Sequence, residues 1–286
     1  MSDLAILQNY FNWVVSNSPS FAEDGTEEIM VFRGHSINGL PLKPSVFREG
    51  VDEENTILKK AKYHACEQLR SFCSDLEKLV LLQHYELKTR LLDFTFNPFI
   101  ALYFACSNPN DKDKDGEVFA LQNICVSEKV SQLIAEYVFQ YGTDEIDMNV
   151  LLQLAEKYDL ETNRNSLIEN LSTPQFFYPA YNNSRIRMQK GFFMIAPLIS
   201  SDTKNKLESC SFIKVIKDND VSGFEYDKET YKNSFIEPLL IKKEEKPKYL
   251  KALAHIGIDE SSVFPEFDHL LHTLNNNYPP LIKDCF

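Results

Sequence analysis

The 286-residue sequence lacks the features that mark a fibrous, secreted or membrane-spanning chain. It has only 9 glycines and 13 prolines and no low-complexity stretch, which indicates a folded chain. Its six cysteines form no CxxC pair and no disulfide-scaffold spacing. No apolar run reaches the length of a membrane span, and the first residues, MSDLAILQNYFNWVV, lack the basic start of a signal peptide. We therefore expect a cytoplasmic protein that does not associate with membranes.

Positive charge is also scarce. The 30 Lys and Arg residues are outnumbered by 42 Asp and Glu residues, which gives a formal net charge of −12. Non-specific binding to duplex DNA depends on neutralising phosphates with a basic surface, and anionic membranes attract the same kind of surface. The composition therefore argues against both of these partners.

Several common enzyme motifs are missing. The sequence has no GxSxG, no P-loop and no GxGxxG, which disfavours serine hydrolases, NTPases and Rossmann enzymes. The stretch DKDKDGE at 111–117 matches half of an EF-hand loop, but Gln122 stands where the bidentate Glu is required. His269 and His272 are one helical turn apart without a matching third ligand. We expect no metal.

The periodicity of apolar residues predicts an α+β fold with a mixed or antiparallel central sheet. We predict one domain over residues 1–286, flanked by a long helix over 54–83 and by a helical lobe over about 127–171. The predicted helices cover 3–15, 54–83, 98–107, 127–141, 144–158, 163–171, 247–257 and about 263–275. The predicted strands cover 27–34, 116–123, 175–181, 192–197, 211–217 and 235–242, with another ending near Thr95.

One apolar stretch, LLQHYELKTRLLDFTFNPFIALYFACS at 81–107, is unusually rich in polar residues. Buried polar groups cost free energy unless each finds a partner. Asn97 and Pro98 are typical of a helix start, so the stretch divides into a loop, a strand and a helix. Its polar residues fall in the loop and at the strand end, where sites are built: His84, Tyr85, Thr89, Arg90, Asp93 and Thr95.

Two further stretches also place polar residues beside apolar strands. In VFRGHS, Arg33 ends an apolar strand and is followed by Gly34, which allows close approach of a backbone or a ligand. In NNSRIRMQKGFFMIAP, Arg185 and Gln189 precede another apolar strand. A buried arginine requires an anionic or hydrogen-bonding partner.

Two explanations of these residues remain open. In the first they form a structural network, in which Arg33 pairs with Asp93 while Gln189 and Thr89 satisfy backbone groups. In the second the strand ends converge at one edge of the sheet. Guanidinium groups gathered there would suit a phosphate-bearing ligand.

The same residues resemble the FRG domain family. The similar segments are FRG at 32–34, QHY with TRLLD-aromatic-T-x-NP and AL-x-FA at 83–105, R-I-x-x-Q-x-G-x-F at 185–193, and GID with S-x-FPEFD at 257–268. They occur in the expected order along nearly the whole chain. Glu86 and Lys88 stand where the family usually has Gly and Pro, and Phe94 stands where it has Trp.

A more distant resemblance is to ADP-ribosyltransferases of the Arg-Ser-Glu type, and it implies a split core. These enzymes carry an Arg on an early core strand, which Arg33 matches. They also have a strand that ends in Ser-Thr-Ser and runs straight into a helix. LLDFTFNPFIALYFA is similar to this element, with residues 93–95, Asp-Phe-Thr, in place of Ser-Thr-Ser.

The third element of that superfamily is a Glu-bearing loop before a strand. RIRMQKGFFMI has a similar shape, but it places Arg185, Arg187 and Gln189 where the catalytic Glu is expected. Related RNA 2′-phosphotransferases use an Arg and His set with NAD. Glu237, before the PLLIKK strand, is a possible substitute acid.

The resemblance implies an NAD-consuming enzyme that modifies a protein or nucleic acid, as bacterial toxins and phage-defence effectors do, with a possible regulatory or antitoxin partner. NAD would be a co-substrate. The residues that it assigns to catalysis are Arg33, His84, Asp93, Thr95 and Gln189. The residues that it assigns to NAD binding are Arg33, Gly34, Tyr85, Thr89, Arg90 and Arg185.

Within this assignment, Arg33 would hold the pyrophosphate, and His84 and Tyr85 would face the nicotinamide or ribose. Thr95 would orient the ribose, and Asp93 would position Arg33 or act as an acid or base. One alternative is a non-catalytic recognition module, in which these residues form a structural network or bind a nucleotide signal. Another is a metal-independent nuclease or phosphodiesterase that uses His84 and Asp93.

Overall fold

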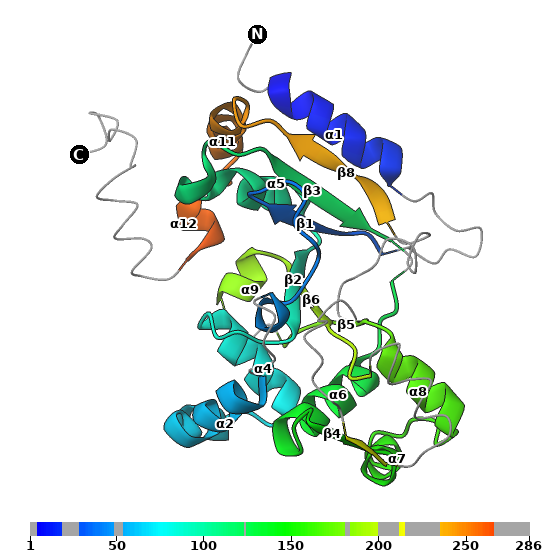
Figure 1. The fold of residues 1–286 in the computed structure, drawn as a ribbon. Coiled ribbons are helices and arrows are strands. Elements are labelled where there is room, and N and C mark those ends of the chain that lie inside the picture. Colours follow the sequence, from blue (N-terminus) through cyan, green and yellow to red (C-terminus); the bar gives the residue numbers. More distant parts are fainter. Residues whose placement is uncertain are drawn as a thin grey trace.

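A six-stranded antiparallel sheet lies at the centre of the protein (Figure 1). The computed structural model describes residues 5–18, 29–48, 54–122, 124–180, 184–199, 212–214 and 235–265. In spatial order the strands are β5 (Gln175–Phe177), β6 (Gly191–Ile195), β2 (Leu91–Thr95), β1 (Val31–His35), β3 (Gly116–Leu121) and β8 (Phe235–Ile241). Each strand overlaps a segment that the sequence predicts as a strand. The α+β class and the antiparallel sheet are confirmed.

The sheet opens between its two middle strands. β1 pairs with β3 along all five of its residues, and β2 pairs with β6 in the same way. β1 and β2, in contrast, share the single register pair Phe32 and Thr95. The sheet therefore consists of two halves, β5-β6-β2 and β1-β3-β8, which diverge from this junction (Figure 1).

Each half of the sheet carries its own helices. On the half with β1, α5 (Pro98–Ser107) packs against β1, α11 (Lys246–His255) packs against α5, and α1 (Ala5–Asn17) packs against α11. The helix start at Pro98 is confirmed, because the side chain of Asn97 accepts a hydrogen bond from the backbone N–H of Phe99 at 3.0 Å. The other half is covered by α4 (Asp75–His84) and α6 (Glu128–Gln140).

The single long helix predicted over 54–83 is wrong. The segment forms α2 (Glu54–His64), α3 (Cys66–Arg70) and α4 (Asp75–His84). Ser74 begins α4 in a capping box: its Oγ accepts from the N–H of Glu77, and the Glu77 carboxylate accepts from the N–H of Ser74. The sequence SDLE has the S-x-x-E spacing of this cap, which competes with a continuous apolar stripe. The restart lets α4 end beside the sheet.

The predicted helical lobe is present as α6 (Glu128–Gln140), α7 (Met148–Lys157) and α8 (Arg164–Ser172). It differs from the prediction at its second helix, because β4 (Glu145–Asp147) precedes α7 and pairs with β7 (Phe212–Lys214). The shorter elements are the 3₁₀ turns η1 (Ser45–Phe47) and η2 (Pro109–Asp111), and the helices α9 (Ser184–Met188) and α12 (Glu260–Val263). His269, His272 and most of the helix predicted at 263–275 lie outside the described residues.

The stretch that imitates an EF-hand has a structural role. Asp111 is buried, and its carboxylate accepts hydrogen bonds from Ser36, Asn108 and Lys114 at 2.6–3.0 Å. Within the described ranges, no three His, Cys, Asp or Glu side chains are grouped as metal ligands would be. Nor does any helix there combine the length and apolar character needed to cross a membrane.

Gly34 is the point where α5 lies closest to the sheet. A Cβ added to it would sit 1.9 Å from the carbonyl oxygen of Ala101 in α5. We therefore expect Gly34→Ala to push α5 away from β1 and to lower the free energy of unfolding by at least about 2 kcal/mol. Urea denaturation measures this change. Gly39→Asn is the control, because Gly39 has open space around it and a φ of +80° that Asn tolerates. Equal stability of both variants would contradict the close packing.

Candidate functional site

The side chain of Arg33 bridges the opening between the two halves of the sheet. It extends from β1, and its Nη1 donates to the backbone carbonyl of Asp93 in β2 at 2.5 Å. Its Nε donates to Nε2 of His35 at 3.0 Å. Since β1 and β2 pair only at Phe32 and Thr95, the guanidinium supplies a hydrogen bond that the strand ladder does not. Burial lowers the pKa of Arg33 to about 10, so the group stays charged at neutral pH.

The carboxylate of Asp93 is separate from this backbone contact. The side chain is 55% exposed, and Oδ2 lies 3.9 Å from Nη1 of Arg33. Both carboxylate oxygens are 3.4 Å from Nε2 of Gln83 in the last turn of α4. Asp93 thus holds Arg33 mainly through its carbonyl, and its carboxylate is left at the opening.

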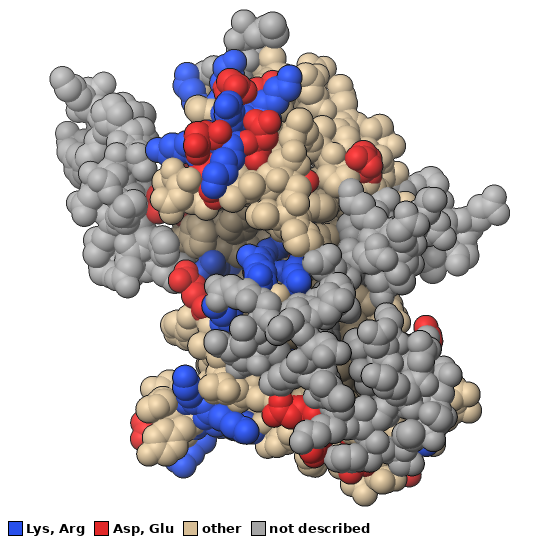
Figure 2. Space-filling view, in the orientation of Figure 1, with Lys and Arg blue, Asp and Glu red and all other residues tan. Residues whose placement is uncertain are grey.

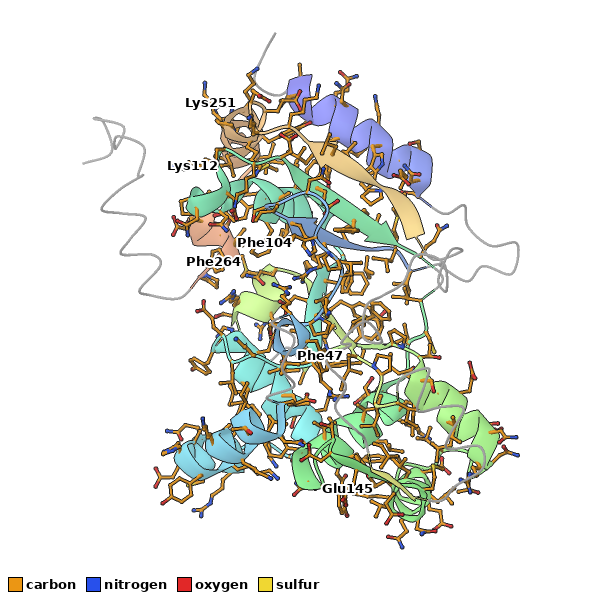
Figure 3. All side chains as sticks on the ribbon, in the orientation of Figure 1. Phe47, Phe104, Lys112, Glu145, Lys251 and Phe264 are labelled. Carbon is orange, nitrogen blue, oxygen red and sulfur yellow. The ribbon has the colours of Figure 1, made fainter. Side chains whose placement is uncertain are left out.

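A cavity of about 160 Å³, here called the central cavity, lies where β1, β2, α4 and α9 meet. It brings together most of the predicted site residues. Those that line it are Arg33, Gly34, His84, Asp93, Thr95, Arg185 and Gln189, with Phe32, Gln83, Phe94, Phe104, Ile186 and Phe193 beside them. Phe104 of α5 also contacts Phe264 edge to face, with ring centroids 5.9 Å apart (Figure 3).

A second and larger cavity, here called the outer cavity, adjoins the first and has a volume of about 560 Å³. Arg33, Gly34 and Phe104 line both. The outer cavity adds Lys43 and Arg48 from the segment after β1. Figure 2 shows Lys and Arg side chains gathered in the hollow between the upper and lower parts of the molecule.

The charge of the two cavities is opposite to that of the chain. Arg33, Lys43, Arg48 and Arg185 line them, and among the described lining residues Asp93 is the only carboxylate. Burial lowers the pKa of Arg48, and the charge of Asp93 opposes that shift. A cationic hollow in a chain of net charge −12 favours an anionic ligand.

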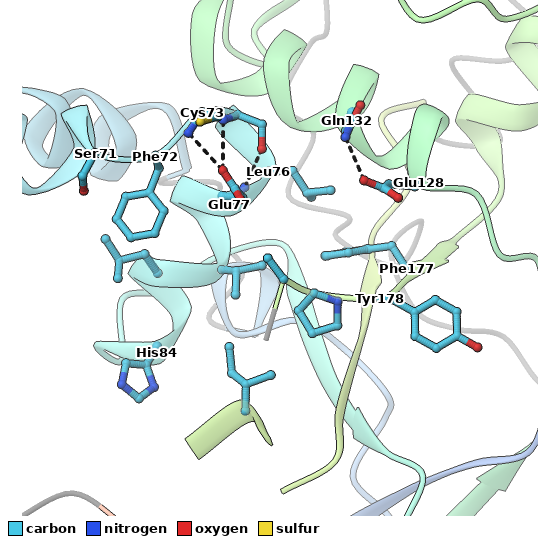
Figure 4. Close-up of a pocket in the computed structure, with 16 residues that line it drawn as sticks. Ser71, Phe72, Cys73, Leu76, Glu77, His84, Glu128, Gln132, Phe177 and Tyr178 are labelled. Atoms are coloured by element: carbon cyan, nitrogen blue, oxygen red, sulfur yellow. Dashed lines mark hydrogen bonds between the residues drawn. The ribbon is translucent and has the colours of Figure 1, made fainter. Parts of the chain in front are cut away.

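A third cavity, here called the flanking cavity, has a volume of about 550 Å³ and shares His84 and Ile186 with the central cavity. Figure 4 shows Phe72 and Tyr178 on opposite sides of it, with Glu77 and Glu128 along one edge. Its described lining contains no Lys or Arg. The flanking cavity therefore differs sharply in charge from the outer cavity.

Two of the predicted residues use their polar groups within the protein. The hydroxyl of Thr95 donates to the carbonyl of Gln189 at 2.6 Å and accepts from the N–H of Asn97 at 2.9 Å. Nε2 of Gln189 donates to the carbonyl of Val263 at 3.2 Å. Both residues shape the wall of the central cavity, and the contact of Gln189 with a backbone carbonyl is the one that the structural-network explanation predicts.

Three predicted residues lie outside all three cavities. Arg90 is 1% exposed and forms a two-pronged pair with Glu54, at 2.8 and 2.5 Å. Thr89 is buried, and its hydroxyl donates to Oε1 of Gln83 at 2.5 Å. Tyr85 is 74% exposed and contacts the ring of His84. The structure thus gives Arg90 and Thr89 internal partners instead of a ligand.

The other candidates are placed as follows. Arg185 stands over the ring of Phe264 at 4.7 Å while lining the central cavity. Arg187 is exposed on α9 and lines none of the cavities. Glu237, the possible substitute acid, is exposed on the edge strand β8, which β3 separates from β1. Glu237 is therefore not positioned to act beside Arg33.

Sequence reasoning missed several residues around Arg33. His35 follows it by two positions and so lies on the same face of the strand, which is a signal that the alternation contains. Gln83 adjoins His84 in the QHY segment. Lys43 and Arg48 lie in the segment after β1. Its turn residues predict a loop, but they do not predict where this loop runs in the folded protein.

Comparison with known proteins gives one family. A model of the FRG domain matches residues 28–114, which span β1 to the start of the turn before β3. The match covers Arg33, Asp93 and both segments that meet at the opening. No curated protein and no solved structure matches this chain.

The buried pair of Arg90 and Glu54 predicts a stability effect without a binding effect. We expect Arg90→Met to lower the free energy of unfolding by about 3–5 kcal/mol, because it removes the cationic partner of the buried Glu54 carboxylate. The double variant Arg90→Met with Glu54→Leu should recover most of this loss. Chemical denaturation of the three proteins tests the expectation. A double variant no more stable than Arg90→Met would contradict it.

Proposed function

We propose that the protein consumes NAD and transfers ADP-ribose to a macromolecular acceptor. The observation that carries this proposal is the guanidinium of Arg33, fixed at the junction of a cation-lined cavity and a smaller cavity that contains one carboxylate. Arginine forms charge-assisted, two-pronged hydrogen bonds to phosphate oxygens. Lys43 and Arg48 add charge on the same side. The outer cavity thus suits the diphosphate of a dinucleotide.

The elements that carry the resemblance to ADP-ribosyltransferases meet at one place. Arg33 comes from an inner strand, residues 93–95 end the neighbouring strand and lead into α5, and residues 185–189 precede β6. All three border the central cavity. The opening between β1 and β2 agrees with a split core, and it supports the proposed likeness.

The proposed reaction needs NAD, the acceptor and one base, and no other reactant. The bond between C1′ of the NAD ribose and the nicotinamide nitrogen breaks, and nicotinamide leaves with the electron pair. A nucleophilic atom of the acceptor bonds to C1′, and its proton passes to the carboxylate of Asp93. The flanking cavity meets the central cavity at His84, so it offers the acceptor a route to the same carbon.

A specific observation favours a second candidate, a module that binds a nucleotide without turnover. The hydroxyl of Thr95 and Nε2 of Gln189 form hydrogen bonds within the protein, and Asp93 is the one carboxylate among the described residues that line the central cavity. Such a module would bind NAD or a related nucleotide and release no nicotinamide. A bacterial toxin or phage-defence role belongs with the enzymatic proposal.

Arg33 provides the first test. We expect the wild-type protein to bind NAD and release nicotinamide, and Arg33→Ala to weaken NAD binding about 10- to 100-fold because it removes a charged donor from the phosphate. Calorimetry measures binding, and labelled NAD reports nicotinamide release and transfer of label. Arg187→Ala is the matched control, since Arg187 lines no cavity. Failure of the wild type to bind NAD would sink the proposal.

Asp93 provides the second test. Asp93→Asn keeps the backbone carbonyl that accepts from Arg33 and removes only the charge of the side chain. We expect nicotinamide release to slow by about 10²- to 10⁴-fold, with NAD affinity and melting temperature nearly unchanged. Full activity in Asp93→Asn would show that the carboxylate is not the base. A large fall in melting temperature would assign it a structural role.

A further inference from the structure

His35 contacts the side chain of Arg33 and has no part in the proposed reaction. It follows Arg33 by two positions on β1, so both side chains lie on the same face of the sheet. Its cross-strand partner on β3 is Glu117. His35 is 7% exposed, lines the outer cavity and contacts the ring of Phe119 at a centroid distance of 4.9 Å.

The contacts of the imidazole fix its tautomer. Nε2 of His35 accepts a hydrogen bond from Nε of Arg33 at 3.0 Å. A neutral imidazole has one acceptor nitrogen, so its proton is on Nδ1. Nδ1 is buried without a hydrogen-bond partner and faces Oε1 of Glu117 at 3.8 Å. That carboxylate is itself held by the N–H of Gly39 at 2.9 Å.

We propose that His35 is the positioning residue for Arg33, and that only its neutral form aims the guanidinium at a phosphate ligand. Nε of Arg33 donates a hydrogen bond to His35, and Nη1 donates one to the carbonyl of Asp93. These two bonds fix the plane of the guanidinium. Among the described residues, none accepts a hydrogen bond from Nη2, which is left for the ligand. The identity of that ligand rests on the proposed function.

Protonation of His35 would break this arrangement. An N–H at Nε2 would face the N–H at Nε of Arg33, and a second positive charge would arise beside it. The charged groups around His35 are Arg33 on β1, Glu117 on β3 and Arg48 after η1. Burial lowers the pKa of His35, and both arginines act in the same direction while Glu117 opposes them. The neutral form therefore persists at neutral pH, and it is lost only at a pH below the ordinary pKa of histidine.

The test is the pH dependence of NAD affinity, measured by calorimetry between about pH 5 and pH 8, where the diphosphate keeps its charge. For the wild type we expect constant affinity above about pH 6.5 and a fall only once the pH drops below the lowered pKa of His35. His35→Gln offers an oxygen acceptor that does not titrate. We expect it to bind like the wild type at neutral pH and to lose the acid dependence.

His35→Phe keeps the ring packing and removes the acceptor, so we expect affinity about tenfold weaker at every pH. Wild-type affinity in His35→Phe, or the same acid fall in His35→Gln, would overturn the proposal. Circular dichroism at each pH confirms that all three proteins are folded.

A second measurement separates this inference from the proposed function. Imidazole ¹⁵N chemical shifts of His35 report its tautomer without any ligand. A proton on Nδ1 at neutral pH is the expected result, even if NAD fails to bind. A proton on Nε2, or a charged imidazole at neutral pH, would overturn the positioning role whatever the ligand is.

Discussion

The hydrogen bond from Arg33 to the carbonyl of Asp93 is the contact on which the site depends. β1 and β2 share a single register pair, so the sheet would have unsatisfied backbone groups just where it opens. Arg33 satisfies one of them and brings a positive charge into the opening. One side chain thus joins the two halves of the sheet and places a positive charge at their junction. Gly34, the next residue, lets α5 pack against the same strand.

The backbone and the side chain of Asp93 have different roles. Its carbonyl holds Arg33, while its carboxylate, 55% exposed, faces the cavities. The sequence alone could not separate a structural pair from a catalytic residue, since both hypotheses use the same two residues. The geometry supports both roles for different atoms. The cations around the opening favour an anionic ligand, because they gather positive charge in a chain whose net charge is −12.

Local sequence patterns predicted most of the fold and part of the site. Short apolar segments located all six strands of the central sheet, and Asn97 with Pro98 located the start of α5. The apolar stripe over 54–83 led to the wrong prediction of one long helix, because the stripe continues through the capping box at Ser74. Arg90 was predicted to bind a ligand because a buried arginine needs an anion. Its partner, Glu54, is 36 residues away in the chain, and no local pattern links the two.

The most direct test of the account is a crystal structure of the protein with ADP-ribose. We predict the diphosphate in the outer cavity, with a phosphate oxygen within hydrogen-bond distance of Nη2 of Arg33 and with Lys43 and Arg48 beside it. Arg33 should keep its contacts to His35 and to the carbonyl of Asp93. A diphosphate bound elsewhere, or an Arg33 that turns away from both partners to reach it, would contradict the account.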